Sequence, residues 1–260
     1  IRRPPRSTLD RSSAASDVYK RQLVLSISVF AQEPDIEGYS SVYAQYSFCN
    51  LKEGKTFSDA RPYIGEYVEL ANSFENDVNV GVLFPMLANE PDHDFFFVEH
   101  ANSREEMGAY KDKMFSLIMA TGNNEQLPME CNVNFSAFQR VGPSSFDELP
   151  EGRRIVKYWP CNYKSGFNRG EMRQARRQMS LEAFEAGAEF GYRYIIPNSG
   201  YDREDDTDYY LSSVAPSEEA SGKNSDIWWS TSRNSEHMDV IRKNTSCGRS
   251  TTYMAFALKE

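Results

Sequence analysis

Four cysteines are the residues of this chain whose type and spacing point most directly to chemistry. Two of them open the same hexapeptide pattern, Cys-Asn-x-Lys-x-Gly, at Cys49 and again 112 residues later at Cys161. The other two, Cys131 and Cys247, are 116 residues apart. A zinc site is usually built from closely spaced Cys-x-x-Cys pairs, and the sequence has none, so disulfides are favoured over metal binding.

Histidine is the other residue type suited to catalysis, and the chain has three: His93, His100 and His237. His100 stands beside Glu99 at the end of an expected strand, which makes it the best candidate for an acid, a base or a haem ligand. Asn50 and Trp159 are the residues that could complete a catalytic set with it. Because the sequence contains no GxSxG, HExxH, GxGxxG or P-loop motif, it leaves open whether the protein is an enzyme.

An acidic segment at residues 202–208 has the composition of a calcium loop. It lacks the glycine and the final glutamate of an EF-hand loop. A solvated hairpin loop is therefore the favoured interpretation, calcium the alternative, and we expect no metal site elsewhere.

The repeated hexapeptide is part of a longer internal similarity. Shifting the chain by 112–116 residues aligns six landmarks in the same order, which chance does not readily produce. They are CNLKEG with CNYKSG, Phe84-Pro85 with Ile196-Pro197, DFF (94–96) with DYY (208–210), Ser103 with Ser217, DKMF (112–115) with DIWW (226–229), and Cys131 with Cys247. The pattern predicts a duplication, with one repeat at 40–141, a second at 153–260 and a boundary near the turn residues 142–145.

Each repeat shows the order strand, helix, strand, strand, helix, strand. In the first, alternating and β-branched segments predict strands at 42–49, 78–85, 95–100 and 131–141, and capping residues predict helices that start after Thr56 and Ser103. The second contains matching strands in RIVKYWPC, YRYIIP, YYLSSV and TTYMAFAL, a helix near 169–189 and another after Ser217. This α+β order is ferredoxin-like (βαββαβ), with sheet order 4-1-3-2 and helices on one face.

A ferredoxin-like sheet leaves one face bare, and two such sheets in one chain can cover each other. The two tandem repeats, packed sheet to sheet as an intramolecular barrel, resemble the dimeric α/β-barrel superfamily in its fused form, over residues 40–260. That superfamily includes antibiotic-biosynthesis-type monooxygenases, haem-degrading proteins, dye-decolorising peroxidases and chlorite dismutase. The resemblance implies a cofactor-independent monooxygenase or a haem-handling enzyme as one possible function. Haem-degrading members use an Asn, a Trp and a His, for which this chain offers Asn50, Trp228 and His100.

The ferredoxin-like order also suggests a role for the cysteines. The first and fourth strands are antiparallel neighbours, so the end of one lies beside the start of the other. This predicts the disulfides Cys49–Cys131 and Cys161–Cys247. A Cys49–Cys161 bridge, or free or metal-binding thiols, are the alternatives. The residues that follow Cys49 and Cys161 then form turns, in which Asn and Gly tolerate a positive φ.

One mixed polar and aromatic strand face is the candidate ligand site. We predict that this face lines a cleft between the halves and holds a small hydrophobic or anionic molecule, the alternative being that its side chains simply interdigitate with the other half. The candidate residues are Tyr43, Gln45, Lys157, Trp159, Arg249 and Tyr253. An exported ligand-binding protein is therefore the main functional hypothesis, with no cofactor expected unless the haem-handling alternative holds.

The start of the chain bears on localisation and charge. Residues 1–22 resemble translated sequencing-adaptor DNA, with a disordered basic arm as the alternative. Residues 23–31 are an apolar run typical of a truncated signal peptide, with a buried strand as the alternative, so we expect a periplasmic or secreted bacterial protein. The net charge of −9 becomes −13 without residues 1–22, which carry six Lys/Arg and two Asp. This acidity argues against nucleic acid and membranes as partners, and we expect a monomer with pseudo-twofold symmetry.

Overall fold

The computed structural model describes residues 39–87, 92–121, 127–147, 152–200 and 207–259. The predictions for residues 1–22 and 23–31, and for all but the end of the acidic loop at 202–208, lie outside this described part. Within it, no helix is long and apolar enough to cross a membrane.

The order of elements follows the order expected from the sequence. The first half contains β1 (Ser40–Leu51), α2 (Phe57–Asn72), β2 (Asn79–Leu87), β3 (Phe95–Ala101), α3 (Arg104–Thr121) and β4 (Met129–Ser144). The second half contains β5 (Arg153–Tyr163), α4 (Arg169–Glu185), β6 (Gly191–Ser199), β7 (Tyr209–Ala215), α5 (Glu218–Ser230), the 3-10 helix η2 (Ser232–Asn234), α6 (Glu236–Asn244), β8 (Thr245–Cys247) and β9 (Thr251–Lys259). The sequence did not predict α6, and the expected last strand is divided into β8 and β9.

Helices begin where the capping residues predict them. Thr56 precedes α2, and its backbone N–H donates to the Asp59 carboxylate at 2.8 Å. The Ser103 hydroxyl accepts from Glu106 N at 3.1 Å before α3. The Ser217 hydroxyl accepts a bond of the same length from Ala220 N, so each cap satisfies a backbone donor that the helix leaves free.

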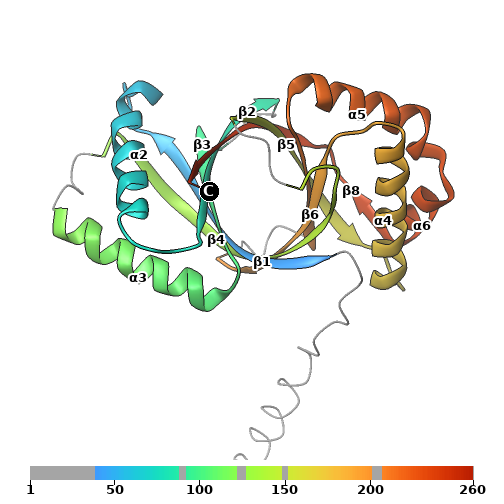
Figure 1. Ribbon diagram of the computed structural model, residues 1–260, viewed down its shortest axis with the longest axis horizontal. Helices are drawn as coiled ribbons and strands as arrows, with labels where there is room; N and C mark the ends of the chain where they lie inside the picture. Colours follow the sequence, from blue (N-terminus) through green and yellow to red (C-terminus); the bar gives the residue numbers. More distant parts are fainter. Residues whose placement is uncertain (1–38, 88–91, 122–126, 148–151, 201–206, 260) are drawn as a thin grey trace, which may run out of the picture. The chain divides into compact units, whose positions relative to one another are not determined.

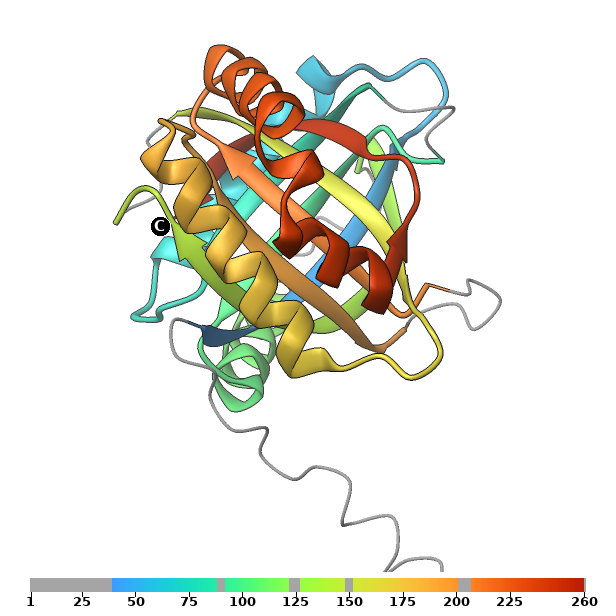
Figure 2. The same ribbon diagram turned by 90° about the vertical axis from the view of Figure 1, so that its right-hand side faces the viewer.

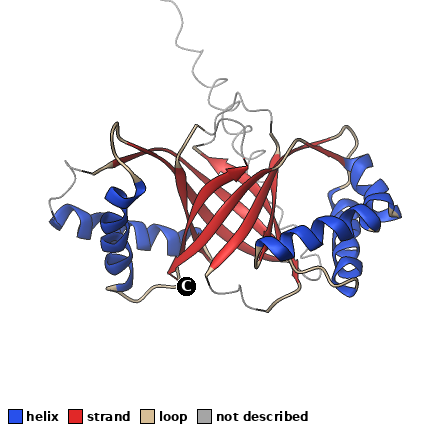
Figure 3. Ribbon diagram, turned by 90° about the horizontal axis from the view of Figure 1, so that it is seen from above, coloured by secondary structure: helices blue, strands red, loops and turns tan. Residues whose placement is uncertain are grey.

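The strands form a closed antiparallel barrel with helices outside it on two sides (Figures 1 and 3). The circular order is β1, β3, β2, β9, β5, β7, β6, β4, and the pairing of β7 with β5 closes it. Read by halves, the order is β4-β1-β3-β2 and β9-β5-β7-β6, which is the predicted 4-1-3-2 in each. The short β8 pairs with the end of β5, where Cys161 lies opposite Cys247.

The two halves join through their strand edges, so their sheets form one closed barrel. β2 pairs with β9 from Val80 to Leu87, and β4 pairs with β6 from Ser136 to Ser144. Edge strands carry unpaired backbone N–H and C=O groups, and pairing across the halves satisfies them.

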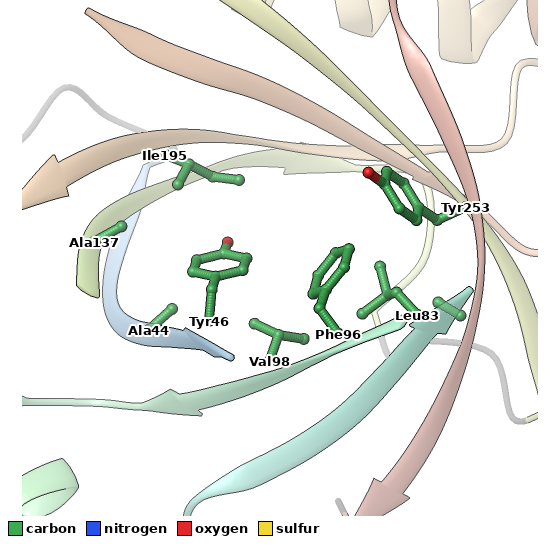
Figure 4. Close-up of a cluster of buried hydrophobic side chains, with 9 residues drawn as sticks. Ala44, Tyr46, Leu83, Phe96, Val98, Ala137, Ile195 and Tyr253 are labelled. Atoms are coloured by element: carbon green, nitrogen blue, oxygen red, sulfur yellow. The ribbon is translucent and has the colours of Figure 1, made fainter. Parts of the chain in front are cut away.

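The barrel interior is packed mostly with aromatic and small side chains (Figure 4). Tyr46 stacks on Phe135 with ring centroids 4.6 Å apart, and Phe96 lies edge-on to Tyr253 at 5.0 Å. The face of β1 with Ala44 and Tyr46 therefore points to the other half. The prediction that the Tyr43 face would do so was wrong, since Tyr43 is buried outside the barrel against α3 residues.

Both predicted disulfides are present. Cys49 bonds Cys131 and Cys161 bonds Cys247, with Cα atoms 4.0 Å apart in each pair. The turns after Cys49 and Cys161 place Gly54 at φ 74° and Gly166 at φ 73°, a region that favours glycine. Each copy of the hexapeptide pattern thus contains a strand end, a disulfide-bonded cysteine and a turn.

Gly142 lies inside β4, although the sequence placed it in a boundary turn. A Cβ at this position would overlap the ring of Tyr192 on the neighbouring strand β6. The glycine is therefore explained by a close approach between strands and not by a turn.

Candidate functional site

A large cavity lies between the outer face of the second-half strands and the helices α4, α5 and α6, which cover that face (Figure 2). We call it the helix–sheet pocket. Its volume is about 730 Å³, within the usual range of small-molecule sites. Its apolar lining includes Ile155, Trp159, Met179, Phe190, Leu211, Ile227, Trp228, Met238 and Ile241. Trp229 also lines the helix–sheet pocket and is 57% exposed, so the pocket opens to the surface beside this side chain.

In the described part of the first half, large side chains occupy the space between helices and sheet. Met107 and Tyr110 of α3 are buried between helix and sheet, and Glu99 of β3 is buried with them. The Tyr67 hydroxyl and the Lys111 ammonium both bond the Glu99 carboxylate. Charge pairing and aromatic packing together close this side of the molecule.

The positions 114 residues further along carry smaller side chains. Glu99, Met107, Tyr110 and Lys111 are followed at that offset by Ser213, Ser221, Asn224 and Ser225, all of which line the helix–sheet pocket. The offset also matches the starts of β3 with β7 and of α3 with α5. Loss of side-chain volume at these positions explains the cavity.

The pocket is cationic. Lys157, Lys164, Arg176 and Arg242 are on its lining, and no Asp or Glu is among the described lining residues. Burial lowers the pKa of the half-buried Lys157, because the charged form loses hydration there. The Arg176 guanidinium lies 5.8 Å from the ring centroid of Tyr194, and its Nε has no hydrogen-bond partner within the described ranges. In an acidic chain, this collection of cations favours an anionic occupant.

The structure separates the residues that the sequence grouped as a ligand site. Lys157 and Trp159 line the helix–sheet pocket. Tyr253 points into the barrel interior, and Arg249 is exposed in the segment between β8 and β9. Tyr43 and Gln45 belong to the first half, where Tyr43 packs under α3 and Gln45 lies opposite Glu99. Only the two residues from β5 share a site, and that site lies between sheet and helices and not between the halves.

The candidate catalytic residues also lie apart. The Asn50 amide is exposed and donates to the Asp92 backbone carbonyl at 3.1 Å. His100 faces the barrel interior and pairs with Ala44 of β1, far along that strand from Asn50. Trp159 and Trp228 line the helix–sheet pocket outside the barrel. The structure therefore brings neither set, Asn50 and His100 with Trp159 or with Trp228, together in one cavity.

The other two histidines have structural surroundings. His93 is buried at one end of the barrel, where it stacks on Tyr253 at 6.0 Å and its Nδ1 lies 2.8 Å from the Asp92 carboxylate. His237 of α6 pairs with Glu182 of α4 at 2.9 Å. Within the described part of the chain, no group of three or more His, Cys, Asp or Glu could hold a metal ion. Asp208, the described end of the acidic loop, accepts from Tyr163 N, as Asp94 does from Leu51 N.

Stability should fall at acidic pH because of His100. Burial, and then the nearby Arg193 guanidinium, hold the pKa of His100 well below its ordinary value of 6.5. Below that pH the unfolded chain binds a proton that the folded chain does not, so the free energy of unfolding should drop by up to about 1.4 kcal/mol per pH unit. Urea unfolding at pH 7.5, 6.5 and 5.5 would measure this slope.

His100→Asn should reduce the slope, and His237→Asn is the control for loss of a surface histidine. An equal slope in the wild type and in His100→Asn would contradict the assignment.

Comparison with known proteins defines the class of fold. No family model and no curated protein matches the sequence. Among solved structures, a protein provisionally assigned as a chlorite dismutase is 12% identical with a TM-score of 0.51, covering 84% of this chain and 95% of that one. Two variants of the chlorite dismutase from Candidatus Nitrospira defluvii also have TM-scores of 0.51, at 11% and 12% identity, covering 84% of this chain and 92% of theirs.

The chain therefore has the fold of chlorite dismutase-like proteins, which are members of the dimeric α/β-barrel superfamily. A haem-binding protein from Thermus thermophilus is 12% identical, with a TM-score of 0.49, over 86% of this chain and 94% of its own. That match adds nothing to the assignment of the fold. At these identities, the likeness describes architecture, and the function has to be argued from the site.

Proposed function

We propose that this protein binds a flat, hydrophobic, anionic molecule of tetrapyrrole size in the helix–sheet pocket of its second half. The main observation that supports this proposal is the cavity of about 730 Å³, whose lining combines aromatic side chains with Lys157 and Arg176. No acidic side chain is among its described lining residues. This keeps the predicted ligand chemistry and moves the site from the inter-half cleft to the helix–sheet pocket.

The chemistry of the lining supports both parts of such a ligand. Trp159 and Trp228 present ring faces and edges on which a flat ring packs favourably. Carboxylates of the ligand would pair with Lys157 and Arg176, which have no carboxylate partner in the described structure. Charge-assisted hydrogen bonds in a partly dry pocket are stronger than those between neutral groups.

Haem is the member of this class that the fold family suggests. The volume, the apolar walls and the cations suit its ring and its two carboxylates. No histidine is among the described lining residues, and the groups there that ligate haem iron in other proteins are the thioethers of Met179 and Met238 and the phenol of Tyr192. Bound haem would supply redox chemistry at its iron. This chain's residues would hold the ring and its carboxylates, so we expect recognition not to depend on a histidine–iron bond.

Binding of two porphyrins tests the proposal. Haemin and metal-free protoporphyrin, titrated into the full chain and followed by absorbance, should both bind. Lys157→Met should weaken both at least about tenfold, because a charge-assisted contact is lost. Gln45→Met is the matched control, since Gln45 is 112 residues before Lys157 on the equivalent strand.

Three results would contradict the proposal in different ways. Failure of both porphyrins to bind would remove the ligand class. Equal affinities of Lys157→Met and Gln45→Met would place the site elsewhere. Binding of haemin without the metal-free ring would show that iron ligation is what the protein recognises.

We also propose that the two halves arose by duplication and that the protein is exported. Matched disulfides, matched positive-φ glycines at Gly54 and Gly166, and the same strand order in each half support the duplication. The pairing of all four cysteines supports an oxidising compartment. Mass spectrometry of the protein from its native source, with free thiols blocked before digestion, would test the second point, and free Cys49 or Cys161 would overturn it.

A further inference from the structure

A second pocket opens inside the barrel, on the other side of the sheet from the helix–sheet pocket. We call it the barrel pocket. It lies at the end where β1, β2, β5 and β6 start, and its volume is about 430 Å³. The lining side chains toward the middle of the barrel are apolar or phenolic: Tyr46, Leu83, Val98, Val156, Tyr158 and Ala255. The same lining also contains four polar residues: His100, Gln139, Arg154 and Arg193.

Arg193 is held in this pocket by a short polar chain. Its Nη1 donates to Gln139 Oε1 at 2.9 Å, and Gln139 Nε2 donates to the Tyr46 hydroxyl at 2.6 Å. Gln139 is 1% exposed and Tyr46 is 3% exposed, so these hydrogen-bonded side chains are fixed in the barrel wall. Within the described ranges, Gln139 is the only hydrogen-bond acceptor for the Arg193 guanidinium, and other N–H groups remain for a ligand.

The described lining of the barrel pocket contains no Asp or Glu that could pair with Arg193. The nearby Arg154 guanidinium repels the charge of Arg193. Lys259, also on the lining, is directed to backbone and amide oxygens of Asn76 and to Val78 O. Burial, and then the charge of Arg193, lower the pKa of His100 on the same lining. A guanidinium in such a place is stabilised by an anion.

We propose that the barrel pocket is a second ligand site, specific for a small carboxylate with an apolar body. Arg193, oriented by Gln139, would pair with the carboxylate in the two-pronged geometry that guanidinium favours. The apolar body would rest against Tyr46, Tyr158 and Val156. A carboxylate fits better than a fully hydrated inorganic anion, because the deeper lining is apolar and phenolic.

This site is independent of the tetrapyrrole proposal. The two pockets lie on opposite faces of the second-half sheet: on β5, Lys157 belongs to the helix–sheet pocket, and the next residue, Tyr158, belongs to the barrel pocket. A ligand in one does not contact the cations of the other.

Benzoate and its neutral analogue benzamide are the probes. Isothermal titration of the full chain should detect benzoate binding, with benzamide and inorganic phosphate at least about tenfold weaker. Arg193→Gln, which keeps hydrogen-bonding capacity and removes the charge, should weaken benzoate binding at least about tenfold. Lys157→Met should leave it unchanged, because its side chain is in the other pocket.

A second variant protects the test against misfolding of Arg193→Gln. Ala257→Leu fills the barrel pocket without touching its charges, and should also weaken benzoate binding at least about tenfold. Equal binding of benzoate and benzamide would overturn the charge assignment. Benzoate affinity that survives both substitutions, or that is lost in Lys157→Met, would overturn the location. Absence of any benzoate binding by the wild type would overturn the proposal itself.

Discussion

Replacing Cys161 and Cys247 together by alanine should lower the free energy of unfolding by about 4 kcal/mol. The bridge joins residues 86 positions apart, so without it the unfolded chain gains the conformational freedom of a long open loop. Urea unfolding followed by far-ultraviolet circular dichroism, under oxidising conditions, would measure the loss. An effect this large is a substantial part of the stability of a typical domain.

The first-half bridge provides the matched control. Cys49 and Cys131 are 82 positions apart, so the loop-entropy model predicts nearly the same cost for their double replacement. Porphyrin binding should distinguish the two variants. Cys247 and Gly248 line the helix–sheet pocket, so only the second-half replacement should weaken it. A cost below about 1 kcal/mol for either pair would contradict the loop-entropy argument, and equal loss of porphyrin binding would contradict the placement of the pocket.

The disulfides and the strand order could be predicted because they depend on residues whose spacing is nearly the same in both halves. Cys49, Cys131, Cys161 and Cys247 keep their spacing within a few residues between the halves. Given the ferredoxin-like order, strand ends and strand starts determine which cysteines meet. The helix caps at Thr56, Ser103 and Ser217 were local signals of the same kind, since a cap depends on residues three positions apart.

The inward face of the strands could not be predicted, because both faces of this barrel are covered. In β1, Ala44 and Tyr46 point inward and Tyr43 points to the helices, yet all three are buried. Alternation identifies a buried face only when the other face is in water. At the end of the chain, residues 248–250 do not belong to a strand. Side chains alternate between faces only within a strand, so the position of Arg249 does not predict which face Tyr253 occupies.

The sequence contains a signal for the helix–sheet pocket, but it is seen only when the two halves are compared position by position. Ser213, Ser221 and Ser225 stand where the first half has Glu99, Met107 and Lys111. Aligning landmarks located the halves. Comparing side-chain volume at each aligned position would have shown that one half is filled and the other is hollow.

Filling that hollow should abolish ligand binding without unfolding the protein. In the double variant Ser221→Met with Ser225→Leu, two side chains one turn apart on α5 would extend into the helix–sheet pocket. Porphyrin affinity should fall by about a hundredfold, because the ring and the new side chains cannot occupy one volume. The free energy of unfolding should stay unchanged or rise by about 1 kcal/mol, since Met and Leu are good helix formers that bury apolar surface.

The choice of positions follows from their hydrogen bonds. Asn224 is left unchanged because its side chain bonds both the N–H and the carbonyl of Glu189 and so holds the segment before β6. Ser225 donates only to the Ser221 carbonyl one turn earlier on the same helix, so its replacement leaves no buried group without a partner. The filling variant therefore changes volume with little other disturbance.

Two further substitutions make the test specific. Ser230→Met adds a similar side chain on an exposed part of α5 and should leave porphyrin affinity unchanged. Tyr110→Ala removes first-half packing, and should cost about 3 kcal/mol of stability without affecting the second-half site. A folded filling variant that binds porphyrin as tightly as the wild type would show that the ligand lies elsewhere. If affinity instead falls while stability is kept, the difference in packing between the halves, and not the fold they share, is what makes one half a binding site.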